Sequence, residues 1–208
     1  MSAALKILQA KCNVADDGSF GPNTARAIAK RYELSDKRGA HLLGQAHHES
    51  GGFKRTKEGL YYSTPERLMA VWPSRFKSVE DAQPYVKNPE ALANKVYNGR
   101  MGNEEGSNDG WKFSGKGFIQ LTGRSNYRSF SSDMRLPEVM QHPNFVETEY
   151  AFESALWFFR ANNLFKLCDQ GVDSDTIKAV TKKVNGGTHG LKDREEQTKK
   201  IYEWLTKA

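Results

Sequence analysis

The residues that decide the fold are Ala46–Glu58, which read AHHESGGFKRTKE. Glu49 and Glu58 lie nine positions apart, so at about 100° per residue they would point to opposite sides of one continuous helix. Gly51 and Gly52 closely follow Glu49, and paired glycines are where helices end and the chain turns. We therefore expect a helix that ends near Glu49, a reversal, and a following loop that carries Glu58.

Two carboxyl groups across a gap are what glycoside hydrolysis uses. One carboxyl group protonates the leaving oxygen, and the other activates a water molecule. On spacing alone, two surface glutamates in a segment rich in lysine and arginine are the commoner explanation. The rest of the sequence must therefore decide between a catalytic pair and a solvated surface.

Length and charge narrow the class of protein. The 208 residues suggest one domain, or one domain with a small appendage. The net charge of +6 favours anionic partners such as nucleic acid, an acidic membrane or an acidic cell-wall polymer. The basic residues are scattered, so we expect no nucleic-acid partner. No stretch approaches the roughly 20 apolar residues of a membrane span.

The cysteines and the first residues give expectations about processing. Cys12 and Cys168 lie far apart in the sequence, and we expect free, buried thiols. The segment Met1–Lys6 lacks a basic region followed by an apolar core, so we expect no signal peptide. We also expect a monomer.

Most of the chain has the pattern of short helices. Apolar residues recur at helical spacing, and capping residues stand at expected helix starts, namely Ser35, Thr64, Ser78 and Asn88, of which Thr64 and Asn88 precede prolines. The expected helices cover 3–12, a segment from Pro22, a segment from Ser35 to Glu49, several short helices in 64–97, a buried central helix in 148–166, a helix from about Asp175 to Asn185, and a last helix from Asp193.

Two further segments connect these helices. Residues 98–110 are turn formers almost throughout, which predicts a long loop and a boundary between two lobes. Residues 118–122 have the pattern of a strand, in which alternate side chains share a face. Phe118, Gln120 and Thr122 would then lie on one face, with Gln120 and Thr122 toward a cleft.

Other catalytic chemistries lack their motifs. A zinc site of the His-Glu-x-x-His type would need a histidine where Gly52 stands, so we expect no metal. There is no Gly-x-Ser-x-Gly nucleophile elbow and no phosphate-binding loop, and we expect no cofactor. A carboxylate pair and a polar strand remain, in a basic and mostly helical protein, and together they favour a polysaccharide hydrolase.

Three segments then resemble one family. Residues 46–53 resemble the His-Glu-(Ser/Thr)-x-Gly segment of family 19 glycoside hydrolases, which include chitinases and bacteriophage endolysins. Residues 113–127 are similar to that family's signature, aromatic-x-Gly-(Arg/Lys)-Gly-x-Ile-Gln-Leu-(Ser/Thr) followed by Asn-Tyr. Residues 184–187 with Asp193 and Arg194 resemble its Ile-Asn-Gly-Gly…Asp-Arg pattern. The short spacing of the glutamates resembles the compact bacterial and phage branch.

The resemblance implies a mainly α, lysozyme-like fold with two lobes, a cleft between them and a small β element at the cleft. It implies a catalytic domain over 36–208, with a smaller lobe at about 64–110. Glu49 would be the general acid, Glu58 the general base, and Thr122 would help to hold the attacking water. The residues that the resemblance implies for sugar binding are His48, Gln120, Asn126, Tyr127, Asn185 and Arg194, and Arg194 would also tune the surroundings of the acid.

Two positions depart from the family's pattern. Thr122 stands where the family commonly has serine, which keeps the hydroxyl group. Lys116 stands where arginine is usual, which keeps the charge but loses the planar fork of donors.

The N-terminal segment 1–35 carries a second resemblance. Residues 17–24 resemble the Asp-Gly-x-Phe-Gly-Pro-x-Thr core of small peptidoglycan-binding modules, although only about half of such a module fits before residue 36. The segment either binds the wall or packs into the catalytic domain. Both alternatives shift the expected substrate from chitin to peptidoglycan.

The sequence therefore predicts an endolysin, an inverting lysozyme-type hydrolase of β-1,4 bonds in bacterial peptidoglycan. Such a protein would be made in the host cytoplasm and would reach the wall after release through a separate membrane protein. The alternatives are a chitinase and a non-catalytic wall-binding protein.

Overall fold

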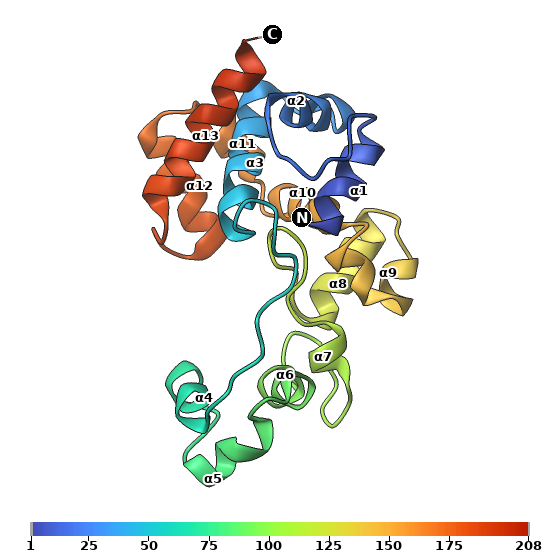
Figure 1. The fold of residues 1–208 in the computed structure, drawn as a ribbon, viewed down its shortest axis with the longest axis vertical. Helices are drawn as coiled ribbons and strands as arrows, with labels where there is room; N and C mark the ends of the chain where they lie inside the picture. Colours follow the sequence, from blue (N-terminus) through green and yellow to red (C-terminus); the bar gives the residue numbers. More distant parts are fainter. Residues whose placement is uncertain (1, 208) are drawn as a thin grey trace. The chain divides into compact units, whose positions relative to one another are not determined.

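The computed structural model describes residues 2–207 and is built mainly of helices (Figure 1). The chain divides into two compact units. Unit 1 comprises Met1–Thr56, Gly117–Gln120 and Phe145–Ala208, and unit 2 comprises Lys57–Lys116 and Leu121–Asn144. The predicted mainly α fold is confirmed.

Unit 1 contains the longest helices of the described chain. Its helices are α1 (Ala3–Lys11), α2 (Pro22–Arg31), α3 (Asp36–Glu49), α10 (Ala151–Ala161), α11 (Leu164–Cys168), α12 (Ser174–Asn185) and α13 (Leu191–Thr206). The helix α3 starts at the predicted cap, where the Ser35 side chain accepts a hydrogen bond from the Arg38 N–H. It ends at Glu49, as the glycine pair predicts.

The two helices α3 and α13 lie along each other at very close range (Figure 1). The cause is Gly44, because a Cβ atom there would lie 2.3 Å from the Thr198 hydroxyl oxygen and 2.9 Å from its Cα. A residue with a side chain would force the helices apart. This small residue therefore lets side chains near the start of α13 reach the end of α3.

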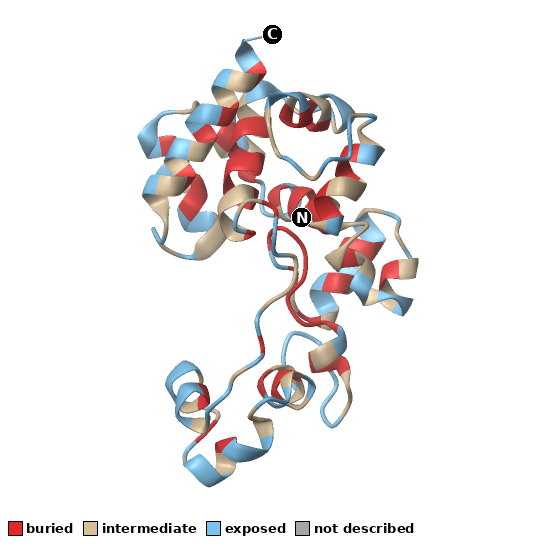
Figure 2. Ribbon diagram, viewed as in Figure 1, coloured by how far each residue is buried: buried red, intermediate tan, exposed pale blue. Residues whose placement is uncertain are grey.

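The core of unit 1 forms around α3 and α10 (Figure 2). Seven of the eleven residues of α10 are buried, including Phe152, Trp157 and Phe159, so the predicted central helix is confirmed over a shorter range. Cys12 and Cys168 are free thiols in this unit, as predicted, but only Cys168 is fully buried, whereas Cys12 is half-buried. Burial raises the pKa of Cys12 to about 11 and that of Cys168 to about 12, so both thiols stay protonated at neutral pH.

Unit 2 is a set of short helices and turns. Its helices are α4 (Pro65–Val71), α5 (Val79–Ala82), the 3-10 helix η1 (Gln83–Tyr85), α6 (Pro89–Tyr97), α7 (Asp109–Lys112), α8 (Arg124–Asp133) and α9 (Glu138–Gln141). A further 3-10 helix, η2 (Pro143–Glu147), spans the point where the chain passes from unit 2 to unit 1. The predicted caps form, because the Thr64, Ser78 and Asn88 side chains each accept a backbone N–H of the following helix.

An apolar cluster holds unit 2 together. Its buried members include Leu68, Phe76 and Leu92. Partly buried aromatic residues such as Tyr62 and Trp72 pack against them. The predicted long loop separates α6 from α7. Both helices and the loop belong to unit 2, so the boundary between two lobes that was predicted at 98–110 is wrong. Unit 2 is therefore stabilised by its own core.

The strand expected over 118–122 does not form, and this prediction is wrong. In residues 2–207 the extended pairings are isolated bridges, one of which joins Lys116 to Leu121. Phe118 and Ile119 are both buried, so the expected alternation of faces is absent. The chain turns at Gly117, whose φ of +99° is a conformation that glycine adopts without steric cost.

None of the helices in residues 2–207 has the length and apolar character needed to cross a bilayer.

Candidate active site

Glu49 occupies the last position of α3, where the chain changes direction sharply. Gly51 and Gly52 follow with φ angles of +60° and +76°. Phe53, at φ +61°, buries its ring completely. A buried aromatic ring directly after the turn fixes the course of the chain, so the carboxyl group of Glu49 is presented at a rigid helix end.

A buried guanidinium group holds the Glu49 carboxylate. Arg194 donates from Nη2 to Glu49 Oε1 at 2.5 Å, and its side chain is 1% exposed whereas that of Glu49 is 30% exposed. Arg194 also donates from Nε to the His189 carbonyl at 3.0 Å and from Nη1 to Gln45 Oε1 at 2.6 Å. A buried ion is tolerated when it is paired and its remaining donors are satisfied, which is the case here.

Gln45 fixes the orientation of that guanidinium group. It lies one helical turn before Glu49 on α3 and is fully buried. Its amide nitrogen donates to Thr181 Oγ1 at 3.0 Å, which leaves its amide oxygen directed at Arg194. Sequence analysis missed both Gln45 and Thr181. The spacing of four between Gln45 and Glu49 was the available signal, since residues so spaced share a helix face.

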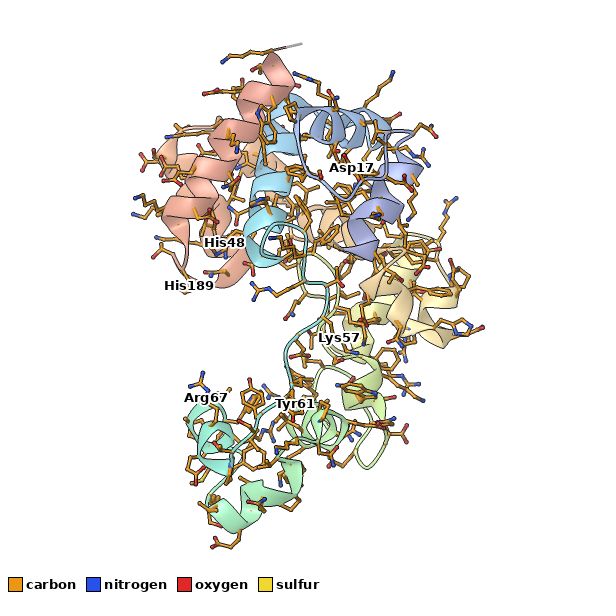
Figure 3. All side chains as sticks on the ribbon, viewed as in Figure 1. Asp17, His48, Lys57, Tyr61, Arg67 and His189 are labelled. Atoms are coloured by element: carbon orange, nitrogen blue, oxygen red, sulfur yellow. The ribbon has the colours of Figure 1, made fainter. Side chains whose placement is uncertain are left out.

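The His48 imidazole forms a second polar pair beside Glu49. Its Nδ1 lies 2.6 Å from Asp193 Oδ2, and this hydrogen bond is the main cause of the lowered pKa of Asp193. Gly190 makes room for the ring, because a Cβ atom there would lie 2.2 Å from two ring atoms. Figure 3 shows His48 and His189 as neighbours in unit 1, and their ring centroids are 6.4 Å apart.

Glu58 belongs to unit 2, and neutral groups hold its carboxylate. The Tyr97 hydroxyl donates to Oε2 at 2.7 Å, and the Gly115 backbone N–H donates to Oε1 at 2.5 Å. The Glu58 N–H in turn donates to the Gly115 carbonyl at 2.9 Å. Burial first, and the Glu58 carboxylate second, raise the pKa of Tyr97 well above its usual range. Tyr97 is therefore a neutral donor at every working pH.

Neither donor to Glu58 was identified from the sequence. Gly115 lies in the Gly-Lys-Gly part of the family signature, which carries no sign of a contact with Glu58. Tyr97 ends α6, and nothing in its sequence surroundings points to Glu58.

Lys116 follows Gly115 in the chain and is a buried cation. Its ammonium group donates to the Lys112 carbonyl at 2.8 Å and to the Ser114 hydroxyl at 3.2 Å, and it lies 5.8 Å from the Tyr127 ring centroid. A lysine fits this pocket of carbonyl, hydroxyl and ring because the contacts need a point charge and no planar fork.

The remaining predicted residues differ in exposure. Thr122 and Asn185 are half-buried, and Gln120 and Asn126 are exposed. Asn126 donates to the Thr122 carbonyl at 2.8 Å, and Asn185 Oδ1 accepts from the Gly187 N–H at 3.0 Å.

Two residues predicted to bind sugar are buried instead. Tyr127 is 0% exposed and its hydroxyl donates to the Ser114 carbonyl at 2.9 Å, while Arg194 is 1% exposed and has the three acceptors described above. Direct contact with a sugar is therefore not available to either side chain. Tyr127 contributes to packing, and Arg194 supports the carboxylate of Glu49.

Within residues 2–207, no group of three or more histidine, cysteine, aspartate or glutamate side chains is arranged to hold a metal ion. The candidate chemistry is carried by two carboxyl groups in different surroundings, one beside a cation and one held by neutral donors. Different surroundings are what allow two carboxyl groups to serve as acid and as base. Such a pair of carboxyl groups fits the acid–base chemistry of glycoside hydrolases.

Comparison with known proteins identifies the family. No family model matches the chain. The chain is 34% identical over 160 residues to a glycosyl hydrolase family 19 domain-containing protein of Haemophilus influenzae, and the match covers 74% of each protein. It is 30% identical over 146 residues to the acidic endochitinase WIN6 of Populus trichocarpa, covering 67% of this chain and 34% of that protein.

The chain belongs to glycosyl hydrolase family 19. The resemblance found in the sequence is confirmed, and with it the lysozyme-like, mainly α fold and the glycoside hydrolase class.

Proposed function

We propose that this protein is an endolysin that hydrolyses β-1,4 glycosidic bonds of bacterial peptidoglycan with inversion at the anomeric carbon. Glu49 is the general acid and Glu58 the general base, and Thr122 helps to hold the attacking water. The observation that carries the proposal is the pair of contrasting carboxylate surroundings in a member of this family. Arg194 holds Glu49 with a charge, and Tyr97 and Gly115 hold Glu58 without one.

The reaction uses each carboxyl group once. Glu49 gives its proton to the glycosidic oxygen as the bond from that oxygen to the anomeric carbon breaks. Water attacks the anomeric carbon from the opposite face, and Glu58 takes up the proton that the water loses. The donor oxygen of Glu49 becomes a carboxylate, and the Arg194 guanidinium stabilises the negative charge that develops there.

Two features favour peptidoglycan as the polymer. The net charge of +6 suits an anionic cell wall, to which long-range attraction would draw the enzyme. The segment 17–24 resembles the core of peptidoglycan-binding modules. Chitin is the second candidate, because one relative is named an endochitinase.

The proposal includes a route to the wall, namely synthesis in the host cytoplasm and release through a separate membrane protein. Expression in a bacterium with and without a co-expressed pore-forming partner tests this route, since lysis should need both proteins. Lysis by the enzyme alone would contradict it.

Digestion of purified peptidoglycan and of chitin in parallel tests the activity. Mass spectrometry of the new reducing ends should show sugars released from peptidoglycan, and proton NMR of fresh product should show the α anomer first. Release of β anomer first would contradict the assigned roles. Cleavage of chitin alone would replace peptidoglycan with the second candidate.

A further inference from the structure

A pocket of about 520 Å³ lies in unit 1 beside the end of α3. It is lined by the N-terminal loop through Phe20, by the end of α3 through His47 and His48, by the turn after α3 through Lys54, and by α13 through Asp193. Gly51 and Gly52 of the turn have no side chains, so the backbone itself forms part of the lining. The roles proposed above for the two glutamates do not use this pocket.

The N-terminal loop is a rigid wall of this pocket. Gln9 is 1% exposed, and its amide nitrogen donates to Asp17 Oδ1 at 2.9 Å and to Thr24 Oγ1 at 3.1 Å. Its amide oxygen accepts from the Gly18 N–H at 2.8 Å. Figure 3 shows Asp17 on this loop of unit 1. The residues that resemble a wall-binding module therefore fold the loop.

The same loop sets Phe20 against the end of α3. The Phe20 ring centroid lies 4.5 Å from that of Phe53 and 6.0 Å from that of His47. Contact with a fully buried ring fixes Phe20, which stays partly exposed toward the pocket. The pocket thus has an aromatic wall held by the folded N-terminal segment.

The pocket also presents charges of both signs. Lys54 is exposed and contributes an ammonium group. Asp193 contributes a carboxylate whose side chain is 47% exposed and which the His48 ring holds at 2.6 Å. An uncharged glycan has no ion to offer such groups. A ligand with both a carboxylate and an ammonium group would complement them.

The position of the pocket relative to Glu49 indicates what could enter it. His48 precedes Glu49 on α3, and Asp193 precedes Arg194, which holds the Glu49 carboxylate. Glu49 itself is not part of the lining. The pocket therefore flanks the proposed acid and does not contain its carboxyl group.

We propose that this pocket binds the peptide stem of peptidoglycan, a short branch that carries carboxylates and, where its third residue is a diamino acid, an ammonium group. This inference rests on the proposed function and names the part of the substrate that the pocket recognises. Lys54 meets a stem carboxylate, Asp193 meets the ammonium group, and Phe20 packs against an alanine methyl group.

The test compares two substrates made from one peptidoglycan, namely intact glycan strands and strands stripped of their stems by an amidase. Wild-type enzyme should cleave intact strands with a kcat/KM about fivefold higher, as expected for one exposed ion pair of up to about 1 kcal/mol. In Lys54→Glu the ratio of the two kcat/KM values should fall to about one, and in Phe20→Ala it should fall partway. Lys178→Glu makes the same charge change at an exposed position of α12 and should keep the wild-type ratio.

The outcomes separate this inference from the proposed function. Equal kcat/KM values for intact and stripped strands in the wild-type enzyme would overturn the stem site and leave the peptidoglycan hydrolase standing. A ratio that Lys54→Glu leaves unchanged would also overturn it. Failure to cleave either substrate would overturn the proposed function itself.

Discussion

The surroundings of Glu49 in unit 1 and of Glu58 in unit 2 hold the same chemical group by different means. Glu49 ends a long helix, and a fully buried cation on the packed helix α13 holds it. Glu58 lies on a loop, and a tyrosine hydroxyl and a backbone N–H hold it. One carboxylate therefore has a charged support on a helical scaffold, and the other has a neutral support on turns.

The difference indicates what each support can do. A guanidinium group stabilises the carboxylate that remains once an acid has donated its proton, and it also opposes the protonated state from which that acid must start. Neutral donors orient a carboxylate and add no charge, so they suit a group that must accept a proton from water. Substitutions that disturb Arg194 should therefore change the charge beside Glu49. Substitutions that disturb Tyr97 should change the geometry in which Glu58 is held.

The largest expected effect comes from Glu49→Gln. The amide keeps the shape and can still accept from Arg194, but it cannot donate a proton to a leaving oxygen. We expect turnover of peptidoglycan to fall by about three to four orders of magnitude, the upper part of the range for general acid catalysis. Initial rates of reducing-end release measure the loss.

The matched control is Glu66→Gln, at an exposed position of α4, which should keep full activity. Binding of Glu49→Gln to intact peptidoglycan should survive, as a sedimentation assay would show. Wild-type turnover by Glu49→Gln would remove Glu49 from catalysis.

Glu58→Ala should lower turnover by roughly two to three orders of magnitude, because no group then accepts a proton from the attacking water. Sodium azide should restore part of the rate, since this small anion fits the vacated space and needs no base. The restored reaction should yield an α-glycosyl azide, which NMR identifies. Equal restoration of Glu49→Gln by azide would contradict the division of roles.

Gln45→Met tests the charged support without touching either glutamate. Methionine has a similar volume but cannot accept from Arg194 Nη1, so a buried donor loses its partner. We expect a loss of about 1–3 kcal/mol in the free energy of unfolding. We also expect roughly tenfold lower kcat, because the guanidinium group is no longer fixed against Glu49.

Gln45→Glu separates packing from charge. It returns an acceptor to Arg194, so stability should partly recover, but the new carboxylate competes with Glu49 for the guanidinium group. The pH profile of kcat should therefore shift although the fold is restored. Denaturant unfolding measures the stability of each variant, and pH–rate profiles measure the shift in kcat. The exposed Gln170→Met is the control. Unchanged stability and kcat in Gln45→Met would show that Gln45 does not position the support.

Local signals in the sequence predicted local structure well. The glycine pair after Glu49 placed the end of α3, and Thr64 and Asn88 before prolines placed two helix starts, because a helix end depends on the nearest few residues. The strand over 118–122 failed for a related reason. A glycine at positive φ overrides an alternating pattern that a short segment shows by chance.

The supports of the two glutamates could not be predicted in the same way. Gln45 and Arg194 are 149 positions apart, and Tyr97 and Glu58 are 39 positions apart. Such contacts depend on how helices and loops pack, which leaves no periodicity in the sequence. The glutamates were singled out by their spacing around the glycine pair, and the resemblance to the family then implied their roles.

Tyr97→Phe tests the neutral support and should have a smaller effect. The substitution keeps the ring and removes one hydrogen bond to Glu58, worth about 0.5–1.5 kcal/mol, so we expect roughly two- to tenfold lower kcat. Tyr61→Phe, at a ring that is 64% exposed, is the matched control. An unchanged kcat in Tyr97→Phe would contradict a role for this hydroxyl in holding Glu58.

The smallest expected effect concerns stability in acid and comes from the His48–Asp193 pair beside Glu49. The His48 hydrogen bond lowers the pKa of Asp193 below its ordinary value of about 3.9. A carboxyl group with a lowered pKa stabilises the fold above about pH 4, and this contribution is lost as the pH falls through the folded-state pKa. The thermal midpoint of the wild type should therefore exceed that of Asp193→Asn at pH 7, and the gap should narrow steadily below about pH 4.

The gap should be small, because Asp193 is 47% exposed and solvent screens its charge. Thermal unfolding followed by circular dichroism at pH 7 and at pH 3 measures the gap, with exposed Asp16→Asn as the control for loss of a charge. A gap for Asp193→Asn that stays constant down to pH 3 would show that the charge of Asp193 does not stabilise the fold through His48.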